Sequence, residues 1–213
     1  TISEAVAVAA SGDTVNVAAG TYNDALGESF PLEPATGTSI IGAPGAQIIH
    51  HDHDRPVPVF QYEDSGYGPT LLSGFTVSAV SDAINIKPSH TSSSAAAPAA
   101  SFEISNNHID SIYGGGVDFY ASSDDRATLN VHDNTFYVAS VNARFNDTLM
   151  GSSVISNNTF TDSQGTAIDG YLDFGSNTSV SLSVDISGNT ITNPTGNGIE
   201  YNISVSESEV AGY

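Results

Sequence analysis

The residues best suited to chemistry stand at the ends of a series of similar segments. In each segment two polar residues, separated by one residue, follow an apolar residue, and together the pairs include two of the four basic residues of the chain. Tyrosine rings, carboxylates and amides in one place suit a sugar chain, because sugar rings stack on aromatic faces and sugar hydroxyls form hydrogen bonds. The pairs are Asn85 and Lys87, Asp118 and Tyr120, Asn142 and Arg144, Asp169 and Tyr171, and Glu200 and Asn202.

These pairs close copies of one repeat. The clearest copy is 157–171, NNTFTDSQGTAIDGY, and it returns as NNHIDSIYGGGVDFY at 106–120 and as GNTITNPTGNGIEYN at 188–202. A shorter copy at 133–144 places Asn142 where the others have an acid, and a looser copy at 74–87 places Asn85 there. Self-similarity at steps of 24 to 33 residues predicts a repeat architecture, in which each copy stacks on its neighbours.

The hydrophobic pattern inside the repeats is that of short strands. Apolar and polar residues alternate, Val, Ile, Thr and Phe are frequent, and Gly, Asn, Asp and Ser bound each run, with no helical period across 71–205. Equivalent positions recur about every 27 residues, enough for three short strands and three turns that stack as parallel coils. We therefore predict an all-β, single-stranded, right-handed parallel β-helix. The residues predicted to point into its core before each polar pair are Ile84, Val117, Val141, Ile168 and Ile199.

One asparagine recurs in four of the repeats. Asn107, Asn134, Asn158 and Asn189 would stack above one another at the same turn. Asparagine tolerates left-handed backbone angles, and its amide can bond to the copy in the next coil. We predict an internal asparagine ladder.

The chain reads as one domain, 1–213. A helix within 1–12 is predicted by a Thr1–Glu4 capping box and by Gly12 as its end, and it would cap the first coil. The first coils would occupy 13–70 and the regular repeats 71–205. The low-complexity segment 89–101 has no counterpart in the other repeats, so we interpret it as a loop excursion.

Charge limits the possible partners. The chain has 24 acidic against 4 basic residues, a formal net charge of −20, and no cysteine. Such a chain repels nucleic acid and anionic membranes, and no apolar run reaches the roughly 18 residues of a membrane span. The acidity fits a high-salt, marine or calcium-containing medium, or it keeps a Ser/Thr/Asn-rich secreted protein soluble.

The stretch 50–54, HHDHD, has the composition of a metal site. Alternation along a strand would place His51 with His53 on one face and Asp52 with Asp54 on the other. Two ligands from one strand fall short of the three or four that zinc takes, so we interpret the stretch as a polar loop.

The beginning of the chain resembles known β-helix proteins. The segments ISEAVAVAASGDTVNVAAGTYND (2–24) and GESFPLEPATGTSIIGAPGAQI (27–48) are similar to the opening of pectin-lyase-like β-helix proteins. More narrowly, they resemble a functionally uncharacterised family of bacterial and archaeal domains at the start of secreted and cell-surface proteins. The resemblance implies the fold and an extracellular or cell-surface location. It implies no single activity, because the superfamily includes lyases, hydrolases, adhesins and structural coils.

Three functions remain for the polar column. The first is non-catalytic binding of a polysaccharide or cell-surface glycan, with Asn85, Lys87, Tyr120, Asn142, Tyr171, Glu200 and Asn202 as binding residues and no required cofactor. The second is catalysis by Asp118, Arg144 and Asp169. The third is a structural coil that assembles end to end through its open β-helix ends.

The catalytic alternative itself has two forms. Asp118 and Asp169 would lie two coils apart, on the order of 10 Å, near the upper end of the carboxylate separation of inverting glycosidases. Alternatively, the column resembles that of pectate-type lyases. That resemblance implies Ca²⁺ held by Asp118, Asp169 and Glu200, with Arg144 as base and Lys87 on the substrate carboxylate, although so acidic a chain suits a polyuronate poorly.

Overall fold

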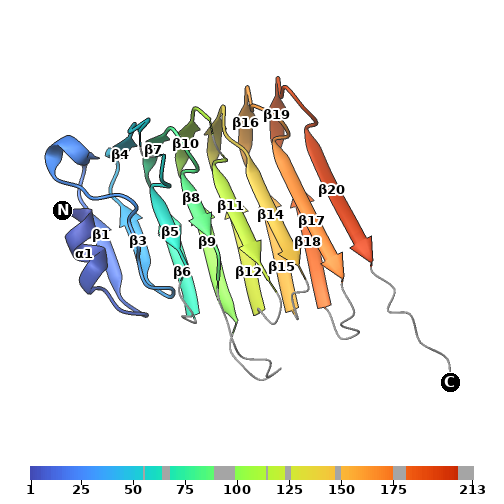
Figure 1. Ribbon diagram of the computed structural model, residues 1–213, viewed down its shortest axis with the longest axis horizontal. Helices are drawn as coiled ribbons and strands as arrows, with labels where there is room; N and C mark the ends of the chain where they lie inside the picture. The colour runs from blue at the N-terminus through green and yellow to red at the C-terminus, as the bar shows by residue number, and fades with distance from the viewer. Residues whose placement is uncertain are drawn as a thin grey trace.

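The computed structural model describes residues 1–54, 56–63, 68–88, 99–113, 115–122, 126–146, 150–174 and 181–205. They form a parallel β-helix of about six coils, which follow one another from the N-terminal to the C-terminal end in Figure 1. The predicted all-β, single-stranded parallel architecture is confirmed.

Three parallel sheets form the sides of the β-helix, and each full coil contributes one strand to each. Sheet A consists of β1 (Thr14–Val17), β3 (Ser39–Gly42), β6 (Gly68–Ser73), β9 (Ala100–Ser105), β12 (Arg126–His132), β15 (Met150–Ser156) and β18 (Ser181–Ser187). Sheet B consists of β2 (Gly20–Asn23), β4 (Ala46–His50), β7 (Thr76–Ala79), β10 (His108–Ser111), β13 (Thr135–Tyr137), β16 (Thr159–Thr161) and β19 (Thr190–Thr192). Sheet C consists of β5 (Phe60–Tyr62), β8 (Ile84–Ile86), β11 (Val117–Ala121), β14 (Val141–Asn146), β17 (Ile168–Phe174) and β20 (Ile199–Val205).

The predicted loop excursion at 89–101 is too long at its C-terminal end. Ala100 and Ser101 already belong to β9, where they pair with Gly68 and Pro69 of β6. Residues 89–98 lie outside the described part of the chain.

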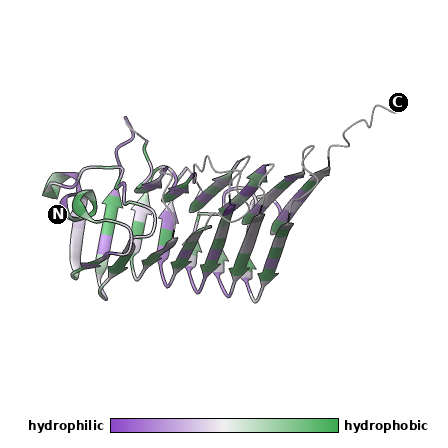
Figure 2. Cartoon of the chain, turned by 90° about the horizontal axis from the view of Figure 1, so that it is seen from below, coloured by the Kyte–Doolittle hydropathy of each residue, from purple (hydrophilic) through white to green (hydrophobic). Residues whose placement is uncertain are grey.

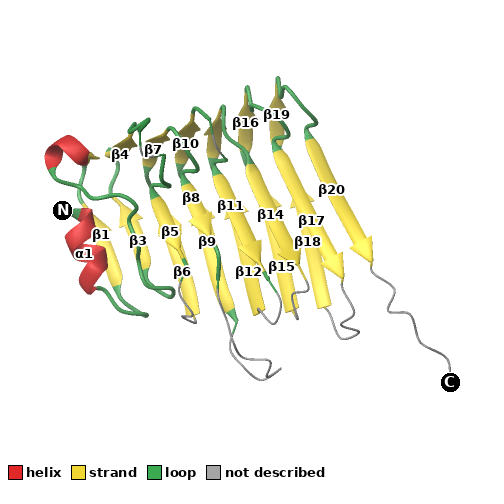
Figure 3. Cartoon of the chain, in the orientation of Figure 1, coloured by secondary structure: helices red, strands yellow, loops and turns green. Residues whose placement is uncertain are grey.

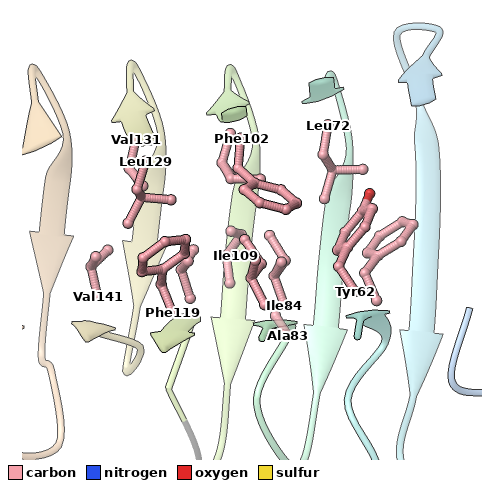
Figure 4. Close-up of a cluster of buried hydrophobic side chains, with 14 of the residues drawn as sticks. Tyr62, Leu72, Ala83, Ile84, Phe102, Ile109, Phe119, Leu129, Val131 and Val141 are labelled. Atoms are coloured by element: carbon pink, nitrogen blue, oxygen red, sulfur yellow. The ribbon is translucent and has the colours of Figure 1, made fainter. Parts of the chain in front are cut away.

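Like residues stack along the core. The rings of Phe102, Phe119 and Phe145 follow one another, with centroids 6.2 and 5.2 Å apart, and Phe136 stacks on Phe160 at 4.7 Å. Figure 4 shows part of this core, and Figure 2 shows hydrophobic segments recurring in successive coils. The residues predicted to point inward at the start of the sheet C strands are fully buried in four of five cases, namely Ile84, Val117, Val141 and Ile168. The fifth, Ile199, is 50% exposed because it lies in the last described coil.

The helix α1 (Ile2–Val8) packs at the N-terminal end of the coils, as Figure 3 shows. The predicted capping box of Thr1 and Glu4 is present, and Ile2 and Val6 are buried. The buried carboxylate of Glu28 accepts hydrogen bonds from the backbone N–H groups of Ile2 (2.8 Å) and Ser3 (2.9 Å), which ties the helix to the segment after the 3₁₀ helix η1 (Asp24–Leu26).

The helix ends earlier than Gly12. Its C-cap, Ala9, is already extended, and the Asp13 carboxylate accepts the N–H of Ala10 at 2.8 Å. The N–H of Gly12 bonds to Gly37 of the next coil at 2.9 Å. These bonds turn the chain toward β1 before another helical turn can form.

The asparagine ladder is confirmed, but part of its expected cause is wrong. The side-chain oxygens of Asn134, Asn158 and Asn189 each accept hydrogen bonds from the backbone N–H and the side-chain amide of the previous rung, at 2.9 to 3.1 Å. The oxygen of the first rung, Asn107, accepts the backbone N–H of Phe75 at 3.0 Å. The left-handed backbone belongs to the preceding residues, namely Asn106 (φ 56°), Asp133 (56°), Asn157 (55°) and Gly188 (66°). The ladder asparagines link the coils by hydrogen bonds, and the residues before them make the turn.

Candidate functional site

The register of sheet C brings the predicted polar residues together. Two columns lie on its outward side, which we call the polar face, and β8, β11, β14, β17 and β20 carry them side by side in Figure 1. Asn142 of the short repeat pairs in register with Asp118 and Asp169, so the alignment of that repeat is confirmed. The first column is Asn85, Asp118, Asn142, Asp169 and Glu200, and the second is Tyr120, Arg144, Tyr171 and Asn202, with Lys87 just beyond β8.

Two clefts hollow this face. The first, of about 310 Å³, lies where the strands begin, and the second, of about 290 Å³, lies two residues further along them. Asp169 lines both clefts and separates them. The first cleft is lined by Tyr113, Ser140, Asn142, Gln164, Thr166 and Asp169, with Gly115 beside them, and the second by Arg144, Asp169, Tyr171 and Asn202.

The sequence pattern predicted only Asn142 and Asp169 among the residues of the first cleft. Tyr113, Ser140, Gln164 and Thr166 come from the turns that lead from sheet B into sheet C, and these turns differ in length from coil to coil. Tyr113 is 75% exposed, and its ring lies edge-on to His53 at 6.1 Å. Their position in the sequence could have indicated them, because they stand one to four residues before the inward residue that begins each of these sheet C strands.

Asp118, in the first column of the polar face, has a raised pKa. Burial raises its pKa, the charge of Asp82 raises it further, and the charges of Arg144 and Lys87 oppose them only in part. The Asn85 amide reaches Asp118 at 3.5 Å, and Asp82 accepts the N–H of Gly115 at 2.7 Å. The protonated form of Asp118 is therefore more favoured than that of an exposed aspartate.

Both cations of the polar face have carboxylate partners. Lys87 Nζ lies 3.6 Å from Glu63 Oε1, and Arg144 lies 3.9 Å from Asp169 Oδ2. Both pairs are partly exposed, so each contributes little to stability. The pairs matter more for ligand binding, because an anionic ligand that approaches either cation also meets the neighbouring carboxylate.

The far end of the face is held by side-chain amides and by a tyrosine. Glu200 accepts hydrogen bonds from Asn197 (2.8 Å) and Asn202 (3.3 Å). On the inward side, the Tyr201 ring packs over Gly170, and burial together with the charge of Asp169 raises its pKa to about 12. Tyr201 therefore stays neutral while it covers the core beneath Asp169.

The described acidic residues of the polar face do not form a metal-binding cluster. Within the described residues, no group of three or more His, Asp or Glu side chains is arranged to hold a metal ion. The three acids considered for calcium are spread along the column, since Asn142 separates Asp118 from Asp169 and only Asp169 and Glu200 are neighbours in register. The calcium assignment stays a prediction without a preformed site to support it.

The stretch 50–54 forms a turn rather than the strand whose alternation we considered. The strand β4 ends at His50, which is buried and contacts Asp24 at 3.1 Å. His51 contacts the Ser78 hydroxyl at 2.8 Å, and Asp52 accepts the N–H of Asp54. No zinc ligand set emerges from these contacts.

Comparison with known families agrees with this architecture. A search of curated proteins and of solved structures gave no match. In the described residues, no helix is long and apolar enough to cross a bilayer. A family model, however, matches residues 1–209, far beyond the opening segments that first suggested a relationship. Because the match spans nearly the whole chain, this parallel β-helix protein belongs to the family described as "Protein of unknown function (DUF1565)".

Proposed function

We propose that the polar face of sheet C binds a polysaccharide without cleaving it. The observation that supports this most directly is the pair of adjoining clefts on either side of Asp169. Each has a volume near the lower end of ligand pockets, about 300 Å³, so each suits one small unit of a longer ligand. Because the clefts follow each other along β14 and β17, the ligand would lie along the strands rather than along the axis of the coils.

The lining of the clefts has the chemistry that sugars require. Tyr113 and Tyr171 present exposed rings, one in each cleft, on which sugar rings can stack. Amides and hydroxyls around them can both donate and accept hydrogen bonds, as sugar hydroxyls do, and they come from Asn142, Asn202, Gln164, Ser140 and Thr166. We place this activity outside the cell or at its surface, where polysaccharides are the available ligands.

A glycan array followed by isothermal titration calorimetry tests the proposal. We expect Tyr171→Ala and Gln164→Ala each to weaken binding roughly tenfold, a loss of about 1.4 kcal/mol. Tyr137→Ala is the matched control, since Tyr137 is similarly exposed but lies on β13 of sheet B. Absence of binding to any glycan, or an equal loss in the control, would refute the proposal.

One observation favours hydrolysis as a second candidate. Asp118, with its raised pKa, and Asp169 are two strands apart in register, about 9.6 Å, which is close to the separation of the acid and base in inverting glycosidases. Release of reducing ends, abolished in both Asp118→Asn and Asp169→Asn, would establish hydrolysis. Calcium-dependent formation of unsaturated uronides, lost in Arg144→Ala, would instead indicate a lyase.

A further inference from the structure

We propose that Asn197 deamidates spontaneously in the folded protein, with the backbone nitrogen of Gly198 as the nucleophile, and that the product loosens the start of β20. An asparagine followed by a glycine is prone to this reaction, because a residue without a side chain leaves its backbone nitrogen open to approach the preceding amide. Residues 197 and 198 are the one Asn-Gly pair in the sequence. The reaction needs water and no ligand, so it goes beyond the proposed function and does not rest on it.

The chemistry is a ring closure followed by hydrolysis. The Gly198 nitrogen gives up its proton and forms a bond to Cγ of Asn197, while the bond from Cγ to Nδ2 breaks and this nitrogen leaves as ammonia. The succinimide ring that results then adds one water molecule. Opening at one of its carbonyls gives aspartate, and opening at the other gives isoaspartate, in which the main chain runs through the former side chain. Nothing is oxidised or reduced, and water is the co-reactant.

The attacking nitrogen is not held by a neighbouring coil. In earlier coils the residue just before the sheet C strand donates its N–H to the next coil at 2.8 to 3.1 Å, as Ala83, Gly116 and Ala167 do. Gly198 occupies this position in the last described coil, and its N–H has no acceptor among the described residues. The Asn197 carbonyl points back and accepts the N–H of Ala167, so the trans peptide directs the Gly198 N–H away from the preceding coil.

The amide under attack is open to water as well. Asn197 is exposed, and the one hydrogen bond given for its side chain runs from Nδ2 to Glu200 Oε2, at 2.8 Å. Asn202 is also exposed, but Ile203 follows it, and a β-branched side chain crowds the backbone nitrogen that would attack. Asn158 of the ladder is buried, and its amide bonds inside the β-helix. Exposure and a following glycine therefore coincide at Asn197.

Deamidation changes two contacts at the start of β20. The Asn197 amide that donates to Glu200 becomes a carboxylate, so repulsion between two negative charges replaces a hydrogen bond. In isoaspartate the main chain also gains one atom, which displaces the carbonyl that accepts the N–H of Ala167. Glu200 is the register partner of Asp169, and Asn202 lines the second cleft. The far end of the polar face therefore loses part of its attachment to β17.

Incubation of the intact protein in heavy-oxygen water at mildly alkaline pH tests the reaction. Each deamidation then leaves a labelled carboxylate, which peptide mapping by mass spectrometry assigns to its residue, and enzymatic methylation detects isoaspartate. We expect Asn197 to become labelled at least about tenfold faster than Asn202, because no side chain crowds the nitrogen that attacks it. Equal rates at the two residues would overturn the proposal.

Gly198→Ala is the matched variant. Gly198 has no left-handed backbone, and a methyl group there would contact only the Ile191 side chain, at an ordinary distance of 3.8 Å. The variant should therefore fold, and it should deamidate at Asn197 about tenfold more slowly, since the methyl group stands beside the attacking nitrogen. A thermal melt establishes that it is folded, and an unchanged rate would show that the Gly198 nitrogen is not the nucleophile.

Backbone hydrogen exchange before and after the incubation tests the structural consequence. We expect the N–H groups of β20 to exchange faster after the incubation in the natural chain and to stay unchanged in Gly198→Ala. Asn197→Asp, which adds the charge without the extra main-chain atom, should show a smaller increase from the outset. Labelling of Asn197 with unchanged exchange in β20 would overturn the loosening. Neither readout involves a glycan, so failure of glycan binding and failure of this proposal are separate results.

Discussion

At the scale of single residues, the ladder asparagines and the acids of the polar face differ in what they do. Asn134 is buried, and its amide bonds to Ile104, to His132 and to the next rung, Asn158. Every polar atom of that side chain is therefore used inside the β-helix. Asp118 and Asn85, by contrast, are left with repulsion and an unpaired oxygen. The ladder therefore uses its polar atoms inside the β-helix, whereas Asn85 keeps an unpaired acceptor on the polar face.

Replacing a central rung should cost far more than replacing the last one. Asn134→Ala leaves the buried N–H of Asn107 and the carbonyl of Ile104 without partners, and we expect a loss of about 3 kcal/mol in the free energy of unfolding. Asn189→Ala should cost only about 1 kcal/mol, because the last described rung is half-buried and water can replace its bonds. Urea unfolding measures both, and equal losses would contradict the account.

His132 should make stability depend on pH. Burial lowers the pKa of its imidazolium, but hydrogen bonds to Asp133 (2.7 Å) and Glu103 (3.2 Å) and the charges of both carboxylates outweigh burial and raise the pKa above its ordinary value. This contribution to stability is fully present below the unfolded pKa of about 6.5 and is lost as the pH rises through the folded pKa.

We therefore expect His132→Gln to lower the free energy of unfolding at about pH 5, by less than about 1 kcal/mol, and to leave it unchanged at about pH 9. Urea titrations at the two pH values measure the difference. A loss of the same size at both would mean that His132 acts through packing or neutral hydrogen bonds.

At the scale of elements, the contact between β17 and β20 shapes the site from below. The Tyr201 ring of β20 packs over Gly170 of β17, and a Cβ at Gly170 would collide with that ring. Gly170 stands directly between Asp169 and Tyr171, which line the clefts. Because Gly170 has no side chain, the Tyr201 ring can pack against its backbone and cover the core beneath Asp169 and Tyr171.

Filling this space should displace the tyrosine. We expect Gly170→Ala to destabilise the protein by about 1–3 kcal/mol, because no room exists for the methyl group. In a Tyr201→Leu background, Gly170→Ala should cost markedly less, which a double-mutant cycle measures. Additive effects of the two substitutions would show that the tyrosine is not the obstacle.

At the scale of the whole molecule, charge matters most, together with the first and last described coils. The formal net charge is −20, and the ion pairs of the polar face use only two cations. Self-repulsion of this size destabilises a compact state at low ionic strength. The N-terminal coil is covered by α1, while apolar side chains such as Ile203 are exposed in the last described coil.

Added salt should therefore stabilise the protein. We expect the melting temperature to rise from low salt to about 1 M sodium chloride, where the Debye length falls to about 3 Å, with most of the gain at the lower concentrations. Differential scanning calorimetry measures the change, with sucrose at equal osmolality as the control. A melting temperature that is flat or falls with salt would refute this account of the charge.

The sequence by itself determined the β-helix, the ladder and the columns of the polar face. These features repeat with the coil, and parallel strands in register turn a repeat in sequence into a column in space, so that even the short repeat placed Asn142 beside Asp169. Inward residues such as Val117 and Val141 could be identified for the same reason, since alternation in a strand decides which side is buried.

Only the tertiary structure decided where the face is hollow and what surrounds each acid. The first cleft depends on Tyr113 and Gln164, which stand in turns of unequal length with no periodic signal. The raised pKa of Asp118 depends first on burial and then on the charge of Asp82, which belongs to the previous coil. The raised pKa of Tyr201 depends on burial, to which its packing over Gly170 contributes, and on the charge of Asp169. Turn shape, burial and the charges of neighbouring coils are set by contacts between residues far apart in the chain, and no repeat in the sequence encodes them.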